Sequence, residues 1–199
     1  MIRYDCLKLL APRITDELVV TSLSGQKIEW ANLSQHHGNL LVGTMGTALG
    51  VGMGVAIGLP NRRVIVIESD GSVLLSLFNL PTLANLNPQN LIVLVFDNQV
   101  YSGTRISEPT ATAGKTDLAM MARGAGIEQA TTVRDLDGFQ KELDDAVAKN
   151  QLRFIVCKVE ESVTHREILR TDLDPIENKY QFVRYLERTE GRAIFRGRG

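Results

Sequence analysis

Short apolar segments alternate with segments of helical periodicity along most of the chain, and this alternation restricts the fold more than any other feature. The apolar segments are continuous and rich in β-branched residues, as expected of strands covered on both faces. Strands joined by helical crossovers run parallel. We therefore predict an α/β fold, with a mostly parallel sheet and helices on both faces. The predicted strands are Leu18–Ser22, Arg63–Glu68, Leu91–Asp97, Arg153–Val159 and, from a weaker pattern, Gln129–Val133.

Start and stop signals for helices lie between these strands. Asp135 is a predicted N-cap, because apolar residues follow it at helical spacing. Thr116 is the predicted cap of a helix that ends at Gly124 or Gly126. Pro81 predicts a break or kink in the helix that follows the second strand, since proline has no N–H group to donate.

Residues 40–60 (LLVGTMGTALGVGMGVAIGLP) contain no charged side chain, and a run of this length could cross a bilayer. Its glycines argue against a membrane span. Each glycine costs about 1 kcal/mol relative to alanine inside a helix, so the glycines need a packing or ligand-approach reason. No cluster of Lys or Arg brackets the run. We therefore predict a buried helix squeezed between close neighbours.

Charge and cysteine content exclude several classes of protein. The chain has 22 Lys and Arg against 23 Asp and Glu, so it offers no overall electrostatic attraction for nucleic acid or an anionic membrane. Its two cysteines, Cys6 and Cys157, stand far apart, which predicts neither a disulfide framework nor a thiolate zinc site. The N-terminal segment lacks the apolar core of a secretory signal. We expect a cytoplasmic location.

The chain becomes more polar near residue 160. We predict one domain over residues 1–159 and a C-terminal extension over residues 160–199, helical at first and then frayed. Asp174-Pro175 predicts the start of the helix, and the terminal RAIFRGRG is expected to be held weakly. An apolar stripe at helical spacing is expected to pack on its own domain: Ile176, Tyr180, Val183 and Leu186.

Two strand ends carry the side chains that point most directly to chemistry. Ser69-Asp70-Gly71-Ser72 follows the second strand, and Asp97-Asn98-Gln99-Val100 ends the third. Parallel strands bring their carboxyl ends to one edge of the sheet, where ligands of open α/β sheets bind. Carboxylate and amide oxygens suit Mg²⁺, which commonly completes its shell with phosphate oxygens. A diphosphate could approach Gly71 closely and be favoured by the free N–H groups of the helix starting at Ser72. Each motif alone is also an ordinary turn sequence.

The segment SDGSVLLSLFNLPTLANLNPQNLIVLVFDNQVYSGT resembles the fingerprint of thiamine-diphosphate enzymes, in which Gly-Asp-Gly is followed one crossover later by Asn-Asn. By this resemblance the magnesium ligands are the side chains of Asp70 and Asn98 and the main-chain oxygen of Val100. Ser69 replaces the first glycine of the fingerprint and Asp97 its first asparagine, and neither position supplies a ligating side chain. The resemblance assigns these residues of the segment to the cofactor site: Ser69, Asp70, Gly71, Ser72, Asn98, Val100 and Tyr101.

An upstream element belongs to the same comparison. Gly43-Thr44-Met45-Gly46 resembles the Gly-x-hydrophobic-Gly element of the family, whose glycine carbonyl accepts a hydrogen bond from the aminopyrimidine. The resemblance therefore adds Gly43, Thr44 and Met45 to the cofactor site. It places Met45 beneath the bend of the cofactor, where it holds the aminopyrimidine nitrogen near the thiazolium carbon. A methionine among leucines and valines is otherwise usual in a core.

The resemblance extends over roughly residues 2–159 and includes sulfopyruvate decarboxylase beta subunits and the C-terminal half of phosphonopyruvate decarboxylases. It implies a subunit that uses thiamine diphosphate and Mg²⁺ to decarboxylate a small 2-oxo acid. It also implies a complementary subunit with the pyrimidine-binding domain and its catalytic glutamate, and hence a homo- or hetero-oligomer. Thr110-Ala111-Thr112 departs from the Thr-His-Thr-like run usual in these relatives, so the substrate is not fixed.

His37 is a weaker catalytic candidate. A histidine near a developing carbanion could relay a proton. Paired histidines in a polar loop such as SQHHGN are more often solvated, so the resemblance and the pattern leave no assigned catalytic side chain on this chain.

Two other functions fit parts of the sequence. The glycine-rich segment followed by Glu68 imitates a Rossmann-type dinucleotide-binding oxidoreductase, but Val55 stands where that fingerprint requires Gly or Ala. The other alternative is a non-catalytic or regulatory module that keeps the thiamine-diphosphate fold. A shift of melting temperature by NAD or by thiamine diphosphate distinguishes the first alternative, and turnover of 2-oxo acids distinguishes the second.

Overall fold

The computed structural model of the chain describes residues 1–101, 107–161, 168 and 174–194. Its main sheet has six strands in the order β2-β1-β3-β4-β8-β7, and all neighbouring strands are parallel. The predicted sheet and its five predicted strands are confirmed within two residues at each end. The strands are β1 (Leu18–Thr21), β2 (Asn39–Leu41), β3 (Val64–Ser69), β4 (Leu91–Asp97), β7 (Ala130–Val133) and β8 (Arg153–Lys158).

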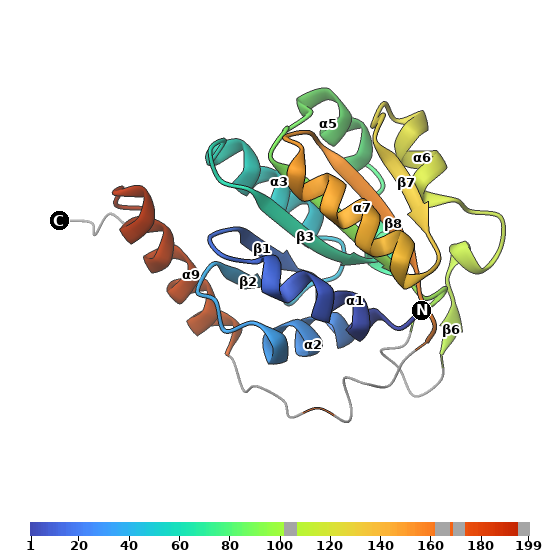
Figure 1. The fold of residues 1–199 in the computed structure, drawn as a ribbon, viewed down its shortest axis with the longest axis horizontal. Coiled ribbons are helices and arrows are strands. Elements are labelled where there is room, and N and C mark those ends of the chain that lie inside the picture. Colours follow the sequence, from blue (N-terminus) through green and yellow to red (C-terminus); the bar gives the residue numbers. More distant parts are fainter. Residues whose placement is uncertain (102–106, 162–167, 169–173, 195–199) are drawn as a thin grey trace.

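Helices cover both faces of the sheet (Figure 1). One layer contains α1 (Arg3–Leu10), α2 (Gly25–Leu33) and α7 (Leu136–Ala148). The other contains α3 (Ala48–Gly58), α5 (Asn79–Leu86), α6 (Leu118–Gly124) and α9 (Pro175–Glu190). The remaining elements are α4 (Asp70–Leu75), the 3-10 helices η1 (Ala11–Arg13) and η2 (Ala111–Ala113), and the antiparallel pair β5 (Val100–Tyr101) and β6 (Glu108–Pro109).

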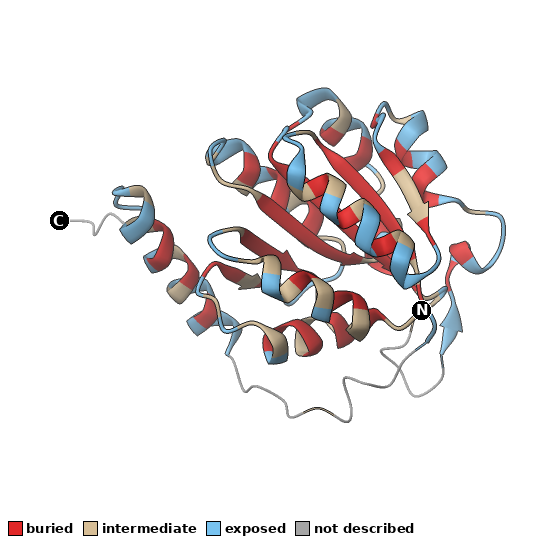
Figure 2. Ribbon diagram, in the orientation of Figure 1, coloured by how far each residue is buried: buried red, intermediate tan, exposed pale blue. Residues whose placement is uncertain are grey.

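Each central strand contributes to two separate cores. Val64 and Val66 of β3 pack in the layer of α3, whereas Ile65 and Ile67 pack in the layer of α1 and α7. Figure 2 shows the central strands as almost entirely buried. Successive strand side chains point to opposite faces, so a strand covered on both sides needs apolar residues at every position.

The uncharged run of residues 40–60 forms the end of β2, a loop and α3. Our prediction of a buried helix squeezed between close neighbours is confirmed for one face of α3 only. Gly52 lies against Val66 of β3, but Val51, Gly54 and Ile57 are exposed. Within the described ranges, no helix combines the length and apolar character needed to cross a membrane.

Two of the three predicted helix signals act as expected, and the third is displaced. Asp135 caps α7, since its Oδ1 accepts a hydrogen bond from the Gly138 N–H at 2.7 Å. α6 ends at Gly124 as predicted, but Asp117 rather than Thr116 caps it. Asp117 is the N-cap because its carboxylate accepts a hydrogen bond from the Met120 N–H, at 2.8 Å.

The predicted interruption near Pro81 divides the helical segment after β3 into α4 and α5. The break falls at residues 76–78, and Pro81 lies in the first turn of α5. There its missing N–H group would have had no partner within the helix, so the proline is tolerated.

α9 covers the outer edge of β2 (Figure 1). The side chain of Asn178 accepts a hydrogen bond from the Leu41 N–H (2.8 Å) and donates one to the Asn39 carbonyl (2.9 Å). This side chain therefore pairs with the edge strand as a neighbouring strand would.

The start of α9 confirms the cap at Asp174, which accepts from the N–H groups of Ile176 and Glu177. The predicted apolar stripe is confirmed at Leu186, which is buried in the core, and is wrong at Ile176 and Tyr180, which are 64% and 49% exposed. The hydrogen bonds of Asn178 to β2 determine which face of α9 is turned toward the domain. The buried side chains on that face are Asn178, Phe182, Tyr185 and Leu186. Residues 195–199 of the expected tail lie outside the described residues.

Candidate functional site

β3 and β4 bring their carboxyl ends together at one edge of the sheet. In their parallel register Ser69 lies opposite Phe96, so Asp70 and Asp97 follow at the same level. Asp70 begins α4, whereas Asn98 follows Asp97 and leads away from the sheet toward β5. The strand register therefore places the two sequence motifs side by side.

A cavity of about 390 Å³ lies at this edge. It brings together six of the residues predicted to bind the cofactor: Met45, Ser69, Gly71, Asn98, Val100 and Tyr101. Ser72 is buried beside it, and its hydroxyl accepts a hydrogen bond from the Gly46 N–H at 2.8 Å, which ties the loop of Met45 to α4. Gly43 and Thr44 are exposed residues of the same loop and do not line the cavity.

The two carboxylate oxygens of Asp70 differ in their hydrogen bonds. Its Oδ2 accepts hydrogen bonds from the hydroxyls of Thr110 (2.6 Å) and Thr112 (3.0 Å). Its Oδ1 is buried and has no hydrogen-bond partner within the described part of the chain. Burial raises the pKa of Asp70 above its ordinary value of 3.8, the hydrogen bond from Thr110 opposes the shift, and the nearby charge of Asp97 adds to it. A buried acceptor without a partner is costly, and a bound cation would remove that cost.

Two further oxygens lie in the turn that follows β4. Gln99 adopts a left-handed conformation (φ 66°), and the Asn98 side-chain oxygen accepts a hydrogen bond from the Val100 N–H at 3.2 Å. Val100 is the register partner of Pro109 across β5 and β6, and the Thr110 N–H donates to the carbonyl of the adjacent Gln99. Hydrogen-bonded and non-hydrogen-bonded pairs alternate along an antiparallel ladder, so the Val100 carbonyl points away from β6. Among the described residues no group of three His, Cys, Asp or Glu side chains could hold a metal. A cation here would therefore use one carboxylate with amide and main-chain oxygens.

Gly71 forms part of the floor of the cavity under the ring of Tyr101. A Cβ atom at position 71 would lie 2.5 Å from Cε1 and 2.8 Å from Cδ1 of that ring. Only glycine leaves room for the tyrosine in this position, so the Asp-Gly sequence has a packing reason beyond the turn.

Six cavity residues were missing from our sequence prediction: Arg3, Ser22, Leu23, Ser24, Gln26 and Leu75. Those at positions 22–26 come from the end of β1 and the start of α2, and a predicted strand that ends in Ser-Leu-Ser-Gly could have indicated them. Arg3 could not be found in this way. It comes from α1 and reaches the cavity through a buried ion pair in which Nε and Nη2 bond to Glu29 at 2.7 and 2.9 Å.

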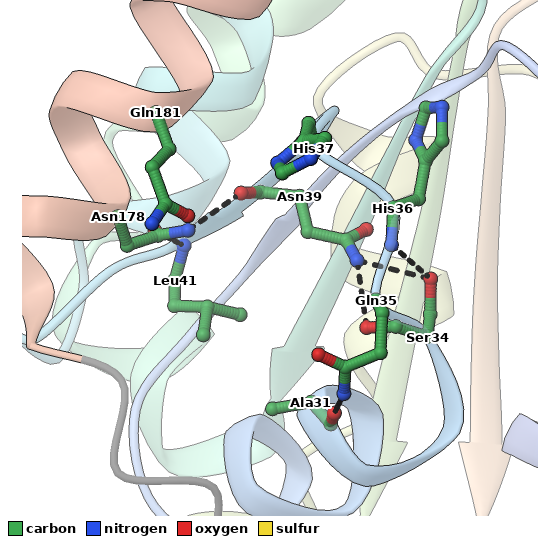
Figure 3. A pocket seen from close by; sticks show the side chains of 9 residues that line it. All are labelled: Ala31, Ser34, Gln35, His36, His37, Asn39, Leu41, Asn178 and Gln181. Carbon is green, nitrogen blue, oxygen red and sulfur yellow. Dashed lines mark hydrogen bonds between the residues drawn. The ribbon is translucent and has the colours of Figure 1, made fainter.

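His37 lies elsewhere. It lines a second cavity of about 240 Å³ between the end of α2, β2 and α9 (Figure 3). The neighbouring His36 packs edge-on against the ring of Tyr185 of α9, with centroids 5.1 Å apart, and burial lowers its pKa. The structure thus does not bring His37 to the cavity that Met45, Gly71 and Asn98 share.

A protein-family model described as "Thiamine pyrophosphate enzyme, C-terminal TPP binding domain" matches residues 21–157. The chain belongs to the thiamine pyrophosphate enzyme family. Thiamine pyrophosphate is the same compound as thiamine diphosphate, so the family predicted from the fingerprint is confirmed. The Rossmann alternative fails, since Gly50 and Gly52 lie inside α3 rather than at a turn between a strand and a helix.

Curated relatives of this thiamine pyrophosphate enzyme domain include decarboxylases and acetolactate synthases. The sulfopyruvate decarboxylase subunit beta of Methanocaldococcus jannaschii is 29% identical over 190 residues, which are 94% of this chain and 98% of that protein. The phosphonopyruvate decarboxylase of Streptomyces viridochromogenes is 34% identical over 142 residues, which are 71% of this chain and 35% of that protein.

Solved structures agree on the fold. Benzoylformate decarboxylase from Polynucleobacter necessarius superimposes on 81% of this chain with a TM-score of 0.68 at 17% identity. The match covers 34% of that protein, so this chain corresponds to about one third of the larger enzyme.

Proposed function

We propose that this chain is the diphosphate- and Mg²⁺-binding subunit of a thiamine pyrophosphate-dependent decarboxylase that acts on a 2-oxo acid such as 3-sulfopyruvate or phosphonopyruvate. The substrate class rests on the names of the relatives. One of them, which matches along 98% of its length, is a sulfopyruvate decarboxylase subunit, and another is a phosphonopyruvate decarboxylase. Both names denote pyruvates with an anionic group at carbon 3.

The unpartnered Oδ1 of Asp70 is the observation that carries the proposal. Mg²⁺ requires oxygen ligands in octahedral geometry and is usually held by one or two carboxylates together with phosphate oxygens and water. Asp70 Oδ1, Asn98 Oδ1 and the Val100 carbonyl supply three such oxygens from two adjacent strand ends. The donor set therefore fits Mg²⁺ with a bound diphosphate.

When bound, thiamine pyrophosphate supplies the electron sink for the loss of CO₂. The side chains here bind and orient that cofactor. Gly71 and Tyr101 shape the floor of the cavity, and Ser69 and Asn98 offer polar groups along its wall. Met45 lies in the same cavity and is 36% exposed. In our proposal its apolar side chain supports the bend of the cofactor, with Gly43 and Thr44 beside it.

We further propose that a complementary chain with the pyrimidine-binding domain and its glutamate completes the active site, in a homo- or hetero-oligomer. The word "beta" in the name of the M. jannaschii relative supports a second kind of subunit. We assign the cofactor site to a domain of residues 1–159, with residues 160–199 as an extension. Both cysteines are free and buried, which supports our proposal of a cytoplasmic location.

Calorimetric titration with thiamine pyrophosphate in the presence of Mg²⁺ tests this proposal on the full chain, alone and mixed with candidate complementary chains. We expect binding that Asp70→Ala abolishes and that Asp137→Ala, at an exposed position of α7, leaves unchanged. Absence of binding in every mixture would contradict the proposal. Binding without turnover of any 2-oxo acid would favour a non-catalytic module.

A further inference from the structure

Two threonines from a distant part of the chain hold Asp70. Thr110 directly precedes the short helix η2 and Thr112 lies inside it, and both residues are 4% exposed. The Thr110 hydroxyl lies 2.6 Å and the Thr112 hydroxyl 3.0 Å from Oδ2 of Asp70. Every described hydrogen bond from these hydroxyls to Asp70 goes to Oδ2, so Oδ1 is left for another ligand.

Thr112 also connects Asp70 to an ion pair between buried Asp97 and partly exposed Lys158. Its hydroxyl lies 2.7 Å from Oδ1 of Asp97, whose Oδ2 is 2.5 Å from the ammonium group of Lys158. Asp97 and Lys158 are partners in the register of β4 and β8, and Asp97 is fully buried. The ammonium group compensates the charge of Asp97, so Asp70 and Asp97 can share a threonine without two uncompensated charges.

Each hydroxyl has a single proton, which decides how the contacts are used. The shortest contact of Thr110 is to Asp70 and the shortest contact of Thr112 is to Asp97. Thr110 therefore donates to Asp70. Thr112 donates mainly to Asp97 and shares the same proton with Asp70 in a longer, three-centre hydrogen bond, so no proton is left for the Thr110 hydroxyl 2.8 Å away. Carboxylate rotation would exchange Oδ1 with Oδ2, and this arrangement opposes it.

We propose that Thr110 and Thr112 are positioning residues that fix the Asp70 carboxylate with Oδ1 directed to the divalent cation. This inference rests on the proposed function, in which Asp70 binds that cation. It also gives Thr110-Ala111-Thr112 a role in cation binding, whereas the sequence connected this run only with substrate identity. Groups that hold a metal ligand by hydrogen bonds typically change metal affinity by about 10- to 100-fold when they are removed.

Electron paramagnetic resonance of Mn²⁺ tests the inference without measuring activity. The full chain, with saturating thiamine pyrophosphate, is titrated with Mn²⁺ as wild type and as Thr110→Val, Thr112→Val, Thr110→Ser and Thr112→Ser. Valine keeps the shape of threonine but removes the hydroxyl, whereas serine keeps the hydroxyl. The matched control is Thr131→Val in β7, which loses one hydroxyl contact, 3.3 Å from Glu142, away from Asp70.

We expect each Thr→Val change at the site to raise the Mn²⁺ dissociation constant by about 10- to 100-fold, while the serine variants and Thr131→Val stay near the wild-type value. If Asp70→Ala abolishes Mn²⁺ binding but the valine variants behave like the control, the positioning role is overturned and the proposed function stands. A serine variant as weak as its valine counterpart also overturns it. If the wild type binds no Mn²⁺ either alone or mixed with the candidate complementary chains, or if Asp70→Ala binds it unchanged, the proposed function itself fails.

Discussion

The close contact between α3 and β3 gives a quantitative prediction about a single methyl group. A Cβ atom at position 52 would lie less than 3.0 Å from Cγ2 of Val66, nearer than real Cβ atoms come to other atoms. Val66 is fully buried in the central strand β3, and its β-branched side chain has few alternative rotamers. In Gly52→Ala the helix must therefore move away from the sheet.

Gly54 provides the matched control, because a Cβ atom there would meet nothing within 4 Å. Both substitutions add the same helix propensity, about 1 kcal/mol in favour of alanine. Overpacking typically costs about 1–3 kcal/mol, and so tight a contact belongs at the upper end of that range. We expect Gly54→Ala to stabilise the chain by up to about 1 kcal/mol and Gly52→Ala to be about 3 kcal/mol less stable than Gly54→Ala.

Urea denaturation of the two variants, followed by circular dichroism, measures this difference directly. In thermal melts it corresponds to about 6–12 °C, at ~2–4 °C per kcal/mol for a domain of this size. Equal stability of Gly52→Ala and Gly54→Ala would refute the close approach of α3 to the sheet. Because the loop of Met45 leads into α3, the same displacement is expected to weaken cofactor binding in Gly52→Ala only.

Three other predictions address the site. In Gly71→Ala the added methyl group forces the Tyr101 ring from its position. Calorimetry should then show about tenfold weaker binding of Mg²⁺ and thiamine pyrophosphate, a loss within the ~1–3 kcal/mol cost of overpacking. Unchanged affinity would show that the ring moves freely. Lys158→Met leaves Asp97 buried without its charge partner. Urea denaturation should show a free energy of unfolding lower by about 3–5 kcal/mol. A loss below about 1 kcal/mol, as is typical of surface ion pairs, would contradict this prediction. Burial raises the pKa of Asp70, so its contribution to the stability of the metal-free chain is present at low pH and is lost as pH rises through that pKa. Asp70→Asn should therefore be more stable than wild type in EDTA at pH 7, with a gap that closes on acidification, and a gap independent of pH would count against the shift.

The parallel sheet was predictable because its central strands are buried on both faces and so are apolar at every position. Strand β2 could not be predicted, because its three residues carry no hydrophobic pattern of their own. Its outer edge is covered by Asn178 of α9, which lies far away in the sequence. The face of α9 could not be predicted for the same reason. It is set by two side-chain hydrogen bonds to a strand that lies 137 and 139 residues earlier in the chain.

The two ends of the site motif were readable from the sequence because each directly follows a strong strand. The residues that hold Asp70 were not. Thr110 and Thr112 lie beyond β6, Lys158 lies at the end of β8, and only the strand order brings them to Asp70 and Asp97. Arg3 likewise comes from a helix before the first strand. Contacts of this kind depend on tertiary structure, which local patterns do not encode.

The position of a divalent cation is the most direct test of the account. In a crystal of the full chain grown with Mn²⁺ and thiamine pyrophosphate, an anomalous difference map locates the metal. We predict a peak about 2.0–2.3 Å from Asp70 Oδ1, Asn98 Oδ1 and the Val100 carbonyl oxygen, close to the short distances of magnesium sites. A metal bound to the cofactor with Asp70 Oδ1 left uncoordinated would contradict it.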